Sequence, residues 1–200
     1  ALGFYGLAVF IGLAIQVSVT YPVLLRLFTP IRLRQFFPGV VQAQLVAFST
    51  SSSAATLPVT MKSAQANLGI SEEVASFVLP LGATINMDGT ALYQAVAAVF
   101  IAQTLGIPLD LTAQLSIVFL ALLASIGTAA VPSAGLVMLI VILETIDVPA
   151  AGIALILGVD RPLDMARTAA NITGDVTVAA IVAAGEGQLA PVGASTDPGG

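Results

Sequence analysis

Thirty-three consecutive residues, from Leu111 to Leu143, carry no charged side chain. A helix needs only about 20 apolar residues to cross a bilayer, so this run is too long for a single span. Its centre at 125–135 reads SIGTAAVPSAG, where small residues and a proline divide the run into two short apolar arms. Irregular backbone at membrane depth is tolerated only where it is buried in protein or lines a cavity. The run therefore predicts a re-entrant helical hairpin.

Charge is scarce along the whole chain: 58% of the residues are hydrophobic and 8% are charged, against roughly 25% charged in a soluble domain. This composition predicts an all-α, polytopic protein of the cell membrane, either plasma or inner membrane, that is surrounded by the lipid bilayer. The chain has no cysteine and no histidine, which excludes disulfides, thiolate metal sites and histidine-based catalysis. The net charge of −5 argues against nucleic acid as a partner. We therefore expect no enzyme and no organic cofactor.

Two further apolar stretches are interrupted in their centres. The stretch 40–61 is uncharged, but its centre at 49–58, STSSSAATLP, predicts a turn inside the membrane. A flexible serine linker is the alternative, although apolar arms do not usually flank a linker. The helix that begins near Glu72 is interrupted by NMDGT at 86–90, where Asp88 has no partner nearby in sequence. A simple proline kink would leave that carboxylate alone, so we predict a broken helix whose freed carbonyl groups suit a hard cation.

Together these features predict transmembrane helices, two re-entrant hairpins and a broken helix around a site near the membrane midplane. Arg26, Arg32 and Arg34 place the first loop in the cytoplasm, whereas the acidic flanks of the second hairpin place its entry on the opposite side. The predicted segments are a transmembrane helix (1–28), a cytoplasmic loop with the first re-entrant hairpin (29–69, tip 49–58), a broken transmembrane helix (70–106, NMDGT at 86–90), the second re-entrant hairpin (107–148, tip 125–135), a transmembrane helix with the substrate and cation face (149–184) and a disordered tail (185–200).

The last helix concentrates acidic, basic and amide side chains in one otherwise apolar segment, Asp160 to Asp175, which reads DRPLDMARTAANITGD. At about 100° per residue, five polar side chains of this segment fall in one stripe roughly 100° wide. They are Asp164, Arg167, Thr168, Asn171 and Asp175. A solvated surface helix or a structural ion pair is the alternative, but the run that follows, VTVAAIVAA, is too apolar for a surface helix. Ionisable residues inside a membrane mark a substrate or ion path.

Charge balance indicates what such a path carries. Three aspartates and one arginine at the predicted site, Asp88, Asp164, Asp175 and Arg167, sum to −2 if Asp160 is offset by the arginine that follows it. Buried uncompensated charge costs several kcal/mol per ion, so the site should recruit cations. An amino acid with a side-chain carboxylate adds −1, and roughly three monovalent cations would restore neutrality. The Arg167 fork suits a carboxylate, and Asp164 suits an ammonium group.

Four motifs carry a resemblance to a known family: SSSAATLPVT, LPLGATINMDGTALYQ, ASIGTAAVPSAG and LDMARTAANITGD. The chain resembles the sodium-coupled glutamate and aspartate transporters, part of the dicarboxylate/amino acid:cation symporters. The resemblance implies L-aspartate or L-glutamate as substrate and sodium ions as co-transported ligands. It also implies elevator-type alternating access, in which this chain is the mobile substrate domain, and a homotrimer that forms through N-terminal helices outside this chain.

The resemblance further implies which residues form the sites. The residues implied for the substrate are Ser51, Ser53, Met87, Thr90, Val131, Gly135, Asp164, Arg167, Thr168 and Asn171. Asp164 would bind the amino group, and Arg167 would bind the side-chain carboxylate. The residues implied for sodium are Gly82, Asn86, Asn171 and Asp175 for one ion, Thr84, Ser125, Ile126 and Thr128 for a second, and Asn86 and Asp88 for a third.

Some positions depart from the family, and some alternatives stay open. Gln94 stands where animal members have a glutamate associated with proton and potassium coupling, and Arg161 is a spare arginine. A proton-coupled or a C4-dicarboxylate symporter of the same family is the nearest alternative. More distant alternatives are a cation or anion channel and an intramembrane aspartyl protease that uses Asp88 and Asp175. The protease would have no use for Arg167 on the same stripe.

Overall fold

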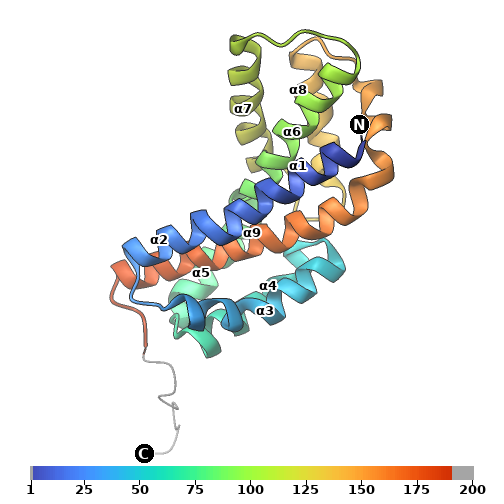
Figure 1. Ribbon diagram of the computed structural model, residues 1–200. Helices are drawn as coiled ribbons and strands as arrows, with labels where there is room; N and C mark the ends of the chain where they lie inside the picture. Colours follow the sequence, from blue (N-terminus) through green and yellow to red (C-terminus); the bar gives the residue numbers. More distant parts are fainter. Residues whose placement is uncertain (1, 191–200) are drawn as a thin grey trace, which may run out of the picture.

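The computed structural model of the chain describes residues 2–190, and the regular elements in that range are helical (Figure 1). They are α1 (Leu2–Ile15), the π-helix η1 (Gln16–Thr20), α2 (Tyr21–Phe28), α3 (Leu33–Thr50), α4 (Ser53–Leu68), α5 (Glu72–Ile85), α6 (Asp88–Thr104), α7 (Leu111–Ile126), α8 (Ala134–Thr145), the 3-10 helix η2 (Ala150–Leu155) and α9 (Leu157–Gly185). Outside the helices, an isolated β-bridge joins Ile70 to Leu189.

Three helical stretches within residues 2–190 are long and apolar enough to cross a membrane: Leu2–Phe28, Glu72–Thr104 and Leu157–Gly185. The first joins α1, η1 and α2 without a break, and the second contains α5 and α6. Large apolar side chains such as Phe4, Phe77 and Leu111 are exposed on the outer surface. Such a surface is expected where lipid takes the place of water. The chain is therefore an all-α, polytopic membrane protein, as its sequence predicts.

α9 is the helix against which most of the other elements pack. It runs beside α1 and α2, with the α3 and α4 pair on one side and α6, α7 and α8 on the other (Figure 1). Two hydrophobic cores meet on α9. Ala170 belongs to the core shared with α1, α6, α7 and α8, and Val176 belongs to the core shared with α2, α3, α4 and α5. The polar stripe of α9 therefore lies between two apolar clusters.

α3 and α4 form the first helical hairpin, and the turn between them is shorter than the predicted tip at 49–58. Only Ser51 and Ser52 lie outside the two helices. Ser51 ends α3 in the left-handed region with a φ of 53°, and the Ser52 hydroxyl accepts the Ala55 N–H at 3.1 Å at the start of α4. Because one left-handed residue and one cap suffice to reverse the chain, the rest of the predicted tip is helical.

The other two breaks lie within the stretches that the sequence indicates. α7 and α8 form the second hairpin, and residues 127–133 connect them. α5 and α6 are separated by Asn86 and Met87 alone, because Asp88 already begins α6. The last predicted segment consists of η2 followed by α9, which ends at Gly185.

The residues directly after α9 differ from the disordered tail that the sequence predicts. The Ala190 N–H donates to the Gly69 carbonyl oxygen at 2.8 Å, and the Ser71 N–H donates to the Gln188 carbonyl oxygen at 3.1 Å. The Ser71 hydroxyl also bonds the Gln188 side chain. These bonds order the start of the tail against the loop that joins α4 to α5. The rest of the predicted tail, 191–200, lies outside the described residues.

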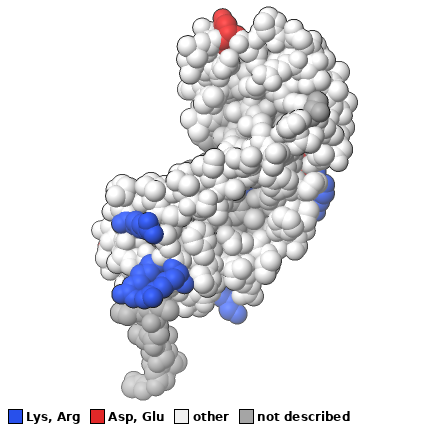
Figure 2. All heavy atoms as spheres, in the orientation of Figure 1, with Lys and Arg blue, Asp and Glu red and all other residues white. Residues whose placement is uncertain are grey.

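Basic and acidic side chains gather in different places on the face shown in Figure 2. Lys and Arg form a group near α2 and the start of α3, a further basic group lies at the right-hand edge, and an acidic group lies at the opposite end, near α7. Helical membrane proteins keep their basic loops in the cytoplasm. The basic group near the start of α3 agrees with the prediction that the loop before α3 lies in the cytoplasm.

We expect the pairing of Gly69 with Ala190 to contribute to stability. Gly69 has a φ of +71°, and a Cβ at this position would collide with the Ala190 carbonyl oxygen. Gly69→Ala should therefore destabilise the protein by more than the about 1–2 kcal/mol that a left-handed non-glycine residue costs. Gly106→Ala is the matched control, because Gly106 has a φ of +73° and no atom within 4 Å of the added Cβ. Thermal denaturation followed by size-exclusion chromatography compares the two variants, and equal losses would contradict the contribution of this contact.

Candidate functional site

The polar stripe of α9 is enclosed by protein. Each of its five residues is at most 4% exposed: Asp164, Arg167, Thr168, Asn171 and Asp175. Helices α1, α3, α5 and α6 pack around α9. This burial excludes the solvated surface helix that the sequence left as an alternative.

Asp164 and Arg167 form an ion pair one turn apart on α9. The Asp164 carboxylate also accepts the N–H of Ser133, from the second hairpin, at 2.8 Å. Arg167 is less completely bonded, because its Nη1 is buried without a hydrogen-bond partner in the described part of the chain. A buried donor without an acceptor costs free energy, so this nitrogen is a place where an acceptor would be favoured.

The Arg167 guanidinium is held from two sides. Its central carbon lies 4.7 Å from the centroid of the Tyr93 ring, and a Cβ on Gly135 would collide with its Nη1. The Tyr93 hydroxyl donates to Asp160 at 2.7 Å. The sequence predicted that Arg161 would offset Asp160, and this prediction is wrong: Arg161 is exposed and forms no ion pair with Asp160 among the described residues. Tyr93 is the partner because α6 brings its hydroxyl to the buried side of α9.

The tips of the two hairpins meet over the stripe. The Ser52 hydroxyl, in the first tip, donates to the Ala130 carbonyl oxygen, in the second tip, at 2.8 Å. The Ala54 N–H approaches the same oxygen at 3.4 Å. Ser133 has a φ of 59°, and this left-handed turn directs its N–H to Asp164. Both tips therefore close over the same part of α9.

A cavity of about 10 Å³ lies between the tips, the start of α6 and the stripe, with space for about one water molecule. Nine of the ten residues that the resemblance implies for the substrate line it: Ser51, Ser53, Met87, Thr90, Val131, Asp164, Arg167, Thr168 and Asn171. The tenth, Gly135, lies against the Arg167 guanidinium. The Ser51 hydroxyl, like Arg167 Nη1, is buried without a partner among the described residues.

The first set of predicted sodium residues comes together where α5, α6 and α9 meet. Asn86 Nδ2 donates to Asp175 Oδ1 at 3.0 Å, and a Cβ on Gly82 would lie 2.8 Å from the same oxygen. Asn171, one turn before Asp175, accepts the Gly89 N–H at 2.9 Å. Oxygen atoms of carboxylates, amides and the main chain are the ligands that hard cations prefer.

The second set lies on two neighbouring helices. Thr84 is at the end of α5, while Ser125, Ile126 and Thr128 are at or just after the end of α7, and the two helices are in contact. The three hydroxyl groups donate to carbonyl oxygens of their own helices. This local bonding leaves their oxygen lone pairs as acceptors. No hydrogen bond within residues 2–190 joins Thr84 to the other three residues.

Asp88, which the resemblance implies for a third sodium ion, accepts hydrogen bonds from two side chains that sequence reasoning missed. Its Oδ2 accepts the Tyr21 hydroxyl at 2.6 Å and Gln16 Nε2 at 2.5 Å. These residues lie 67 and 72 positions earlier in the chain, and their polarity within an apolar span was the available signal. Asp175 is bonded to a different side chain, so the hydrogen bonds described here do not link the two aspartates into the dyad of an aspartyl protease.

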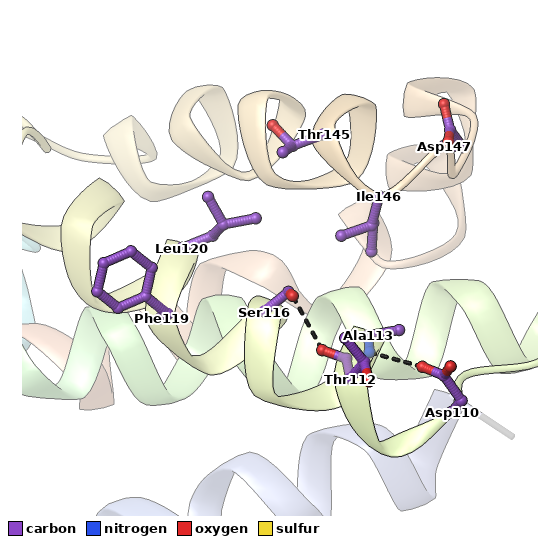
Figure 3. A pocket seen from close by; sticks show the side chains of 9 residues that line it. All are labelled: Asp110, Thr112, Ala113, Ser116, Phe119, Leu120, Thr145, Ile146 and Asp147. Atoms are coloured by element: carbon purple, nitrogen blue, oxygen red, sulfur yellow. Dashed lines mark hydrogen bonds between the residues drawn. The ribbon is translucent and has the colours of Figure 1, made fainter.

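A larger cavity, of about 470 Å³, lies between the arms of the second hairpin at its acidic end (Figure 3). Two of its polar side chains bond within their own helix: the Ser116 hydroxyl donates to the Thr112 carbonyl oxygen at 2.9 Å, and Asp110 accepts the Ala113 N–H at 2.7 Å (Figure 3). None of the predicted site residues lines this cavity. The smaller cavity over α9 is the better candidate, because it contains the predicted site residues and two buried donors that have no partner within residues 2–190.

Comparison with known proteins gives consistent matches. Residues 1–184 match the family described as "Sodium:dicarboxylate symporter family". The chain is 48% identical to "Excitatory amino acid transporter 2" of Homo sapiens over 181 residues, which are 90% of this chain and 32% of that protein. It is 47% identical to "Excitatory amino acid transporter 5" of Mus musculus over 182 residues (91% and 33%). It is 45% identical to "Excitatory amino acid transporter" of Caenorhabditis elegans over 181 residues (90% and 36%).

The chain thus spans about a third of the length of these relatives. The matched region contains the four motifs, the two hairpins, the broken helix and the stripe of α9. The fold and the apolar outer surface agree with a membrane transporter. The chain belongs to the sodium:dicarboxylate symporter family, whose members are transporters and not enzymes.

Proposed function

We propose that the full-length protein is a secondary active symporter that carries L-aspartate or L-glutamate together with sodium. The proposal rests on two buried polar atoms that have no hydrogen-bond partner in the described part of the chain, Arg167 Nη1 and the Ser51 hydroxyl. Both residues line one cavity together with Asp164. A guanidinium fork, a carboxylate and neutral polar groups around one cavity suit a zwitterion with a second carboxylate. The name of the relatives, excitatory amino acid transporter, supports the same class of substrate.

Each charged group of such a substrate has a counterpart on α9. Its ammonium group would replace Arg167 as the partner of Asp164, and the guanidinium would then donate two hydrogen bonds to the side-chain carboxylate in a bidentate pair. Thr168 and Asn171 offer neutral polar contacts on the same stripe. A C4-dicarboxylate has no ammonium group and would leave the buried Asp164 carboxylate uncompensated, which favours the amino acid over that alternative.

The net charge of the site supports coupling to cations. Four aspartates and one arginine give a formal charge of −3, from four negative charges and one positive: Asp88, Asp160, Asp164 and Asp175 with Arg167. The sum is one charge more negative than the sequence indicated, because Asp160 is bonded to Tyr93 and not to an arginine. Each buried uncompensated charge costs several kcal/mol, so bound cations would stabilise the site. The family description supports sodium as the cation.

The second hairpin is the better candidate for the gate. A cavity of about 10 Å³ cannot hold an amino acid, so a tip must move when the substrate binds. The first hairpin packs against α5 and α9, and the residues after α9 pair with the loop at its base. The second hairpin packs mainly on α6 and reaches the stripe through Ser133. Fewer contacts oppose its movement.

The proposal extends to the assembly. In the family that the chain resembles, a mobile substrate domain moves by an elevator mechanism within a homotrimer, and this chain would be that domain. The exposed apolar side chains of the helices would face lipid or the helices of the trimer scaffold. The length of the relatives, about three times the matched region, leaves room for such a scaffold.

The sodium dependence of substrate binding tests the proposed function. Isothermal titration of L-aspartate into the purified full-length protein is repeated over a range of sodium concentrations, with potassium holding the ionic strength constant. If at least one sodium ion binds with the substrate, the affinity should rise by up to about tenfold per tenfold increase in sodium for each coupled ion. An affinity that does not change with sodium would contradict sodium coupling, and a pH series at low sodium then tests the proton-coupled alternative.

The substrate specificity tests the role of Arg167. Arg167→Cys removes the carboxylate partner, so we expect aspartate affinity to fall by about 100-fold or more and neutral amino acids to become substrates. Arg161→Cys is the matched control, because Arg161 is an exposed arginine on the same helix, and it should keep the affinity for aspartate. Competition against radiolabelled substrate in proteoliposomes measures both variants. Unchanged aspartate selectivity in Arg167→Cys would refute the assignment.

Cross-linking of the two tips tests the gate. Ser52→Cys and Ala130→Cys place one thiol in each tip, at positions joined by a hydrogen bond of 2.8 Å. Oxidation of the double variant should abolish aspartate binding, and reduction should restore it, because the cavity cannot open while the tips are joined. The two single variants, treated with the same oxidant, are the controls. Full binding by the cross-linked protein would show that the tips do not need to separate.

A further inference from the structure

Two side chains of the first transmembrane helix hold the same carboxylate oxygen of Asp88. Gln16 Nε2 donates to Oδ2 at 2.5 Å, and the Tyr21 hydroxyl donates to Oδ2 at 2.6 Å. The other oxygen, Oδ1, accepts the Gly89 N–H at 3.0 Å. A carboxylate has about four lone-pair positions. The two side chains therefore fill Oδ2, and the remaining acceptor position is on Oδ1.

A π turn places both donors on the same side of their helix. In an α-helix, two residues five positions apart point about 140° away from each other, because each residue turns by about 100°. Residues Gln16–Thr20 instead form a π-helix, in which the Tyr21 N–H bonds the Gln16 carbonyl oxygen. A turn that closes over five residues brings residue 21 over residue 16. Single π turns are rare and occur frequently at functional sites.

Tyr21 also contacts α9. Its hydroxyl lies 3.2 Å from the carbonyl oxygen of Ala170, the residue before Asn171. Gly174 permits this approach, because a Cβ there would lie 2.8 Å from the Tyr21 hydroxyl and 3.2 Å from Asn86 Nδ2. The hydroxyl has one proton and two acceptors in reach, and the charged carboxylate is the closer one. Tyr21 thus lies where the first helix, the broken helix and α9 meet.

We propose that Tyr21 and Gln16 are positioning residues of a cation site at Asp88, and that the π turn makes both available to it. The inference rests on the proposed sodium coupling. By filling Oδ2, the two donors fix the orientation of the carboxylate and direct Oδ1 to the cation. Both donors are neutral, so they leave the negative charge of Asp88 to be compensated by the ion. Loss of either donor lets the carboxylate rotate and weakens the binding of sodium.

The test compares Tyr21→Phe with Tyr5→Phe in the purified full-length protein. Tyr21→Phe removes only the hydroxyl that bonds Asp88. Tyr5→Phe is the matched control, because Tyr5 lies on the same transmembrane helix and its buried hydroxyl has no partner among the described residues. Isothermal titration of L-aspartate over a sodium series gives the sodium concentration at which the affinity is half of its limiting value. Gln16→Leu, which removes the other donor, is a second variant in case Tyr21→Phe does not yield folded protein.

In Tyr21→Phe and Gln16→Leu we expect the sodium concentration that gives half of the limiting aspartate affinity to rise about tenfold. This is the effect of losing one hydrogen bond to a charged group. The aspartate Kd at saturating sodium should stay within about twofold of the unmodified protein, and Tyr5→Phe should follow the unmodified protein throughout. The inference would be overturned if this sodium concentration were unchanged or lower in Tyr21→Phe and Gln16→Leu. A lower concentration would show that the two donors compete with the ion for the carboxylate. If the unmodified protein itself shows no sodium dependence, the proposed coupling fails, and the inference fails with it.

Discussion

Apart from the exposed Arg161, the ionisable side chains of α9 are buried away from water and lipid, and the surrounding elements provide the hydrogen-bond partners that solvent would otherwise provide. Asp164 is bonded by the N–H of Ser133, Asp160 by Tyr93 and Asp175 by Asn86. These partners come from the second hairpin, from α6 and from the break between α5 and α6. The buried polar side chains of α9 need hydrogen-bond partners, and this need explains why elements far apart in sequence converge on α9.

The same need explains why the helices are interrupted at this level. A regular α-helix uses its N–H and C=O groups internally, and only its ends and irregular turns offer them to other groups. The breaks at Ser51–Ser52, at Asn86–Met87 and at 127–133 all lie beside the stripe or its cavity. The π turn at Gln16–Thr20 serves the same region through side chains. Such interruptions would weaken an isolated helix, but in this protein they place polar groups around one small cavity.

Sequence reasoning was most successful where chemistry follows from local spacing. The stripe of α9 could be predicted because about 100° per residue places Asp164 and Arg167 on one side of any α-helix. The residues around the cavity could be named from the motifs. Their exact contacts could not be predicted from the motifs. For example, the pairing of Asp160 with Tyr93 in place of Arg161 depends on how α6 lies against α9. Likewise, the close packing of Gly135 on the Arg167 guanidinium is visible only when the second hairpin is in position.

By itself, the sequence determined that the chain is a helical membrane protein, where its helices are interrupted, and which side of the last helix carries the charges. These properties depend on hydrophobicity and on helical periodicity, which act over a few neighbouring residues. Only the tertiary structure decided that Tyr21 and Gln16 hold Asp88, that two serines suffice for the first tip, and that the residues after α9 pair with the loop at Gly69. Contacts of this kind join residues that are far apart in the chain, and they form only when separate helices have packed against one another.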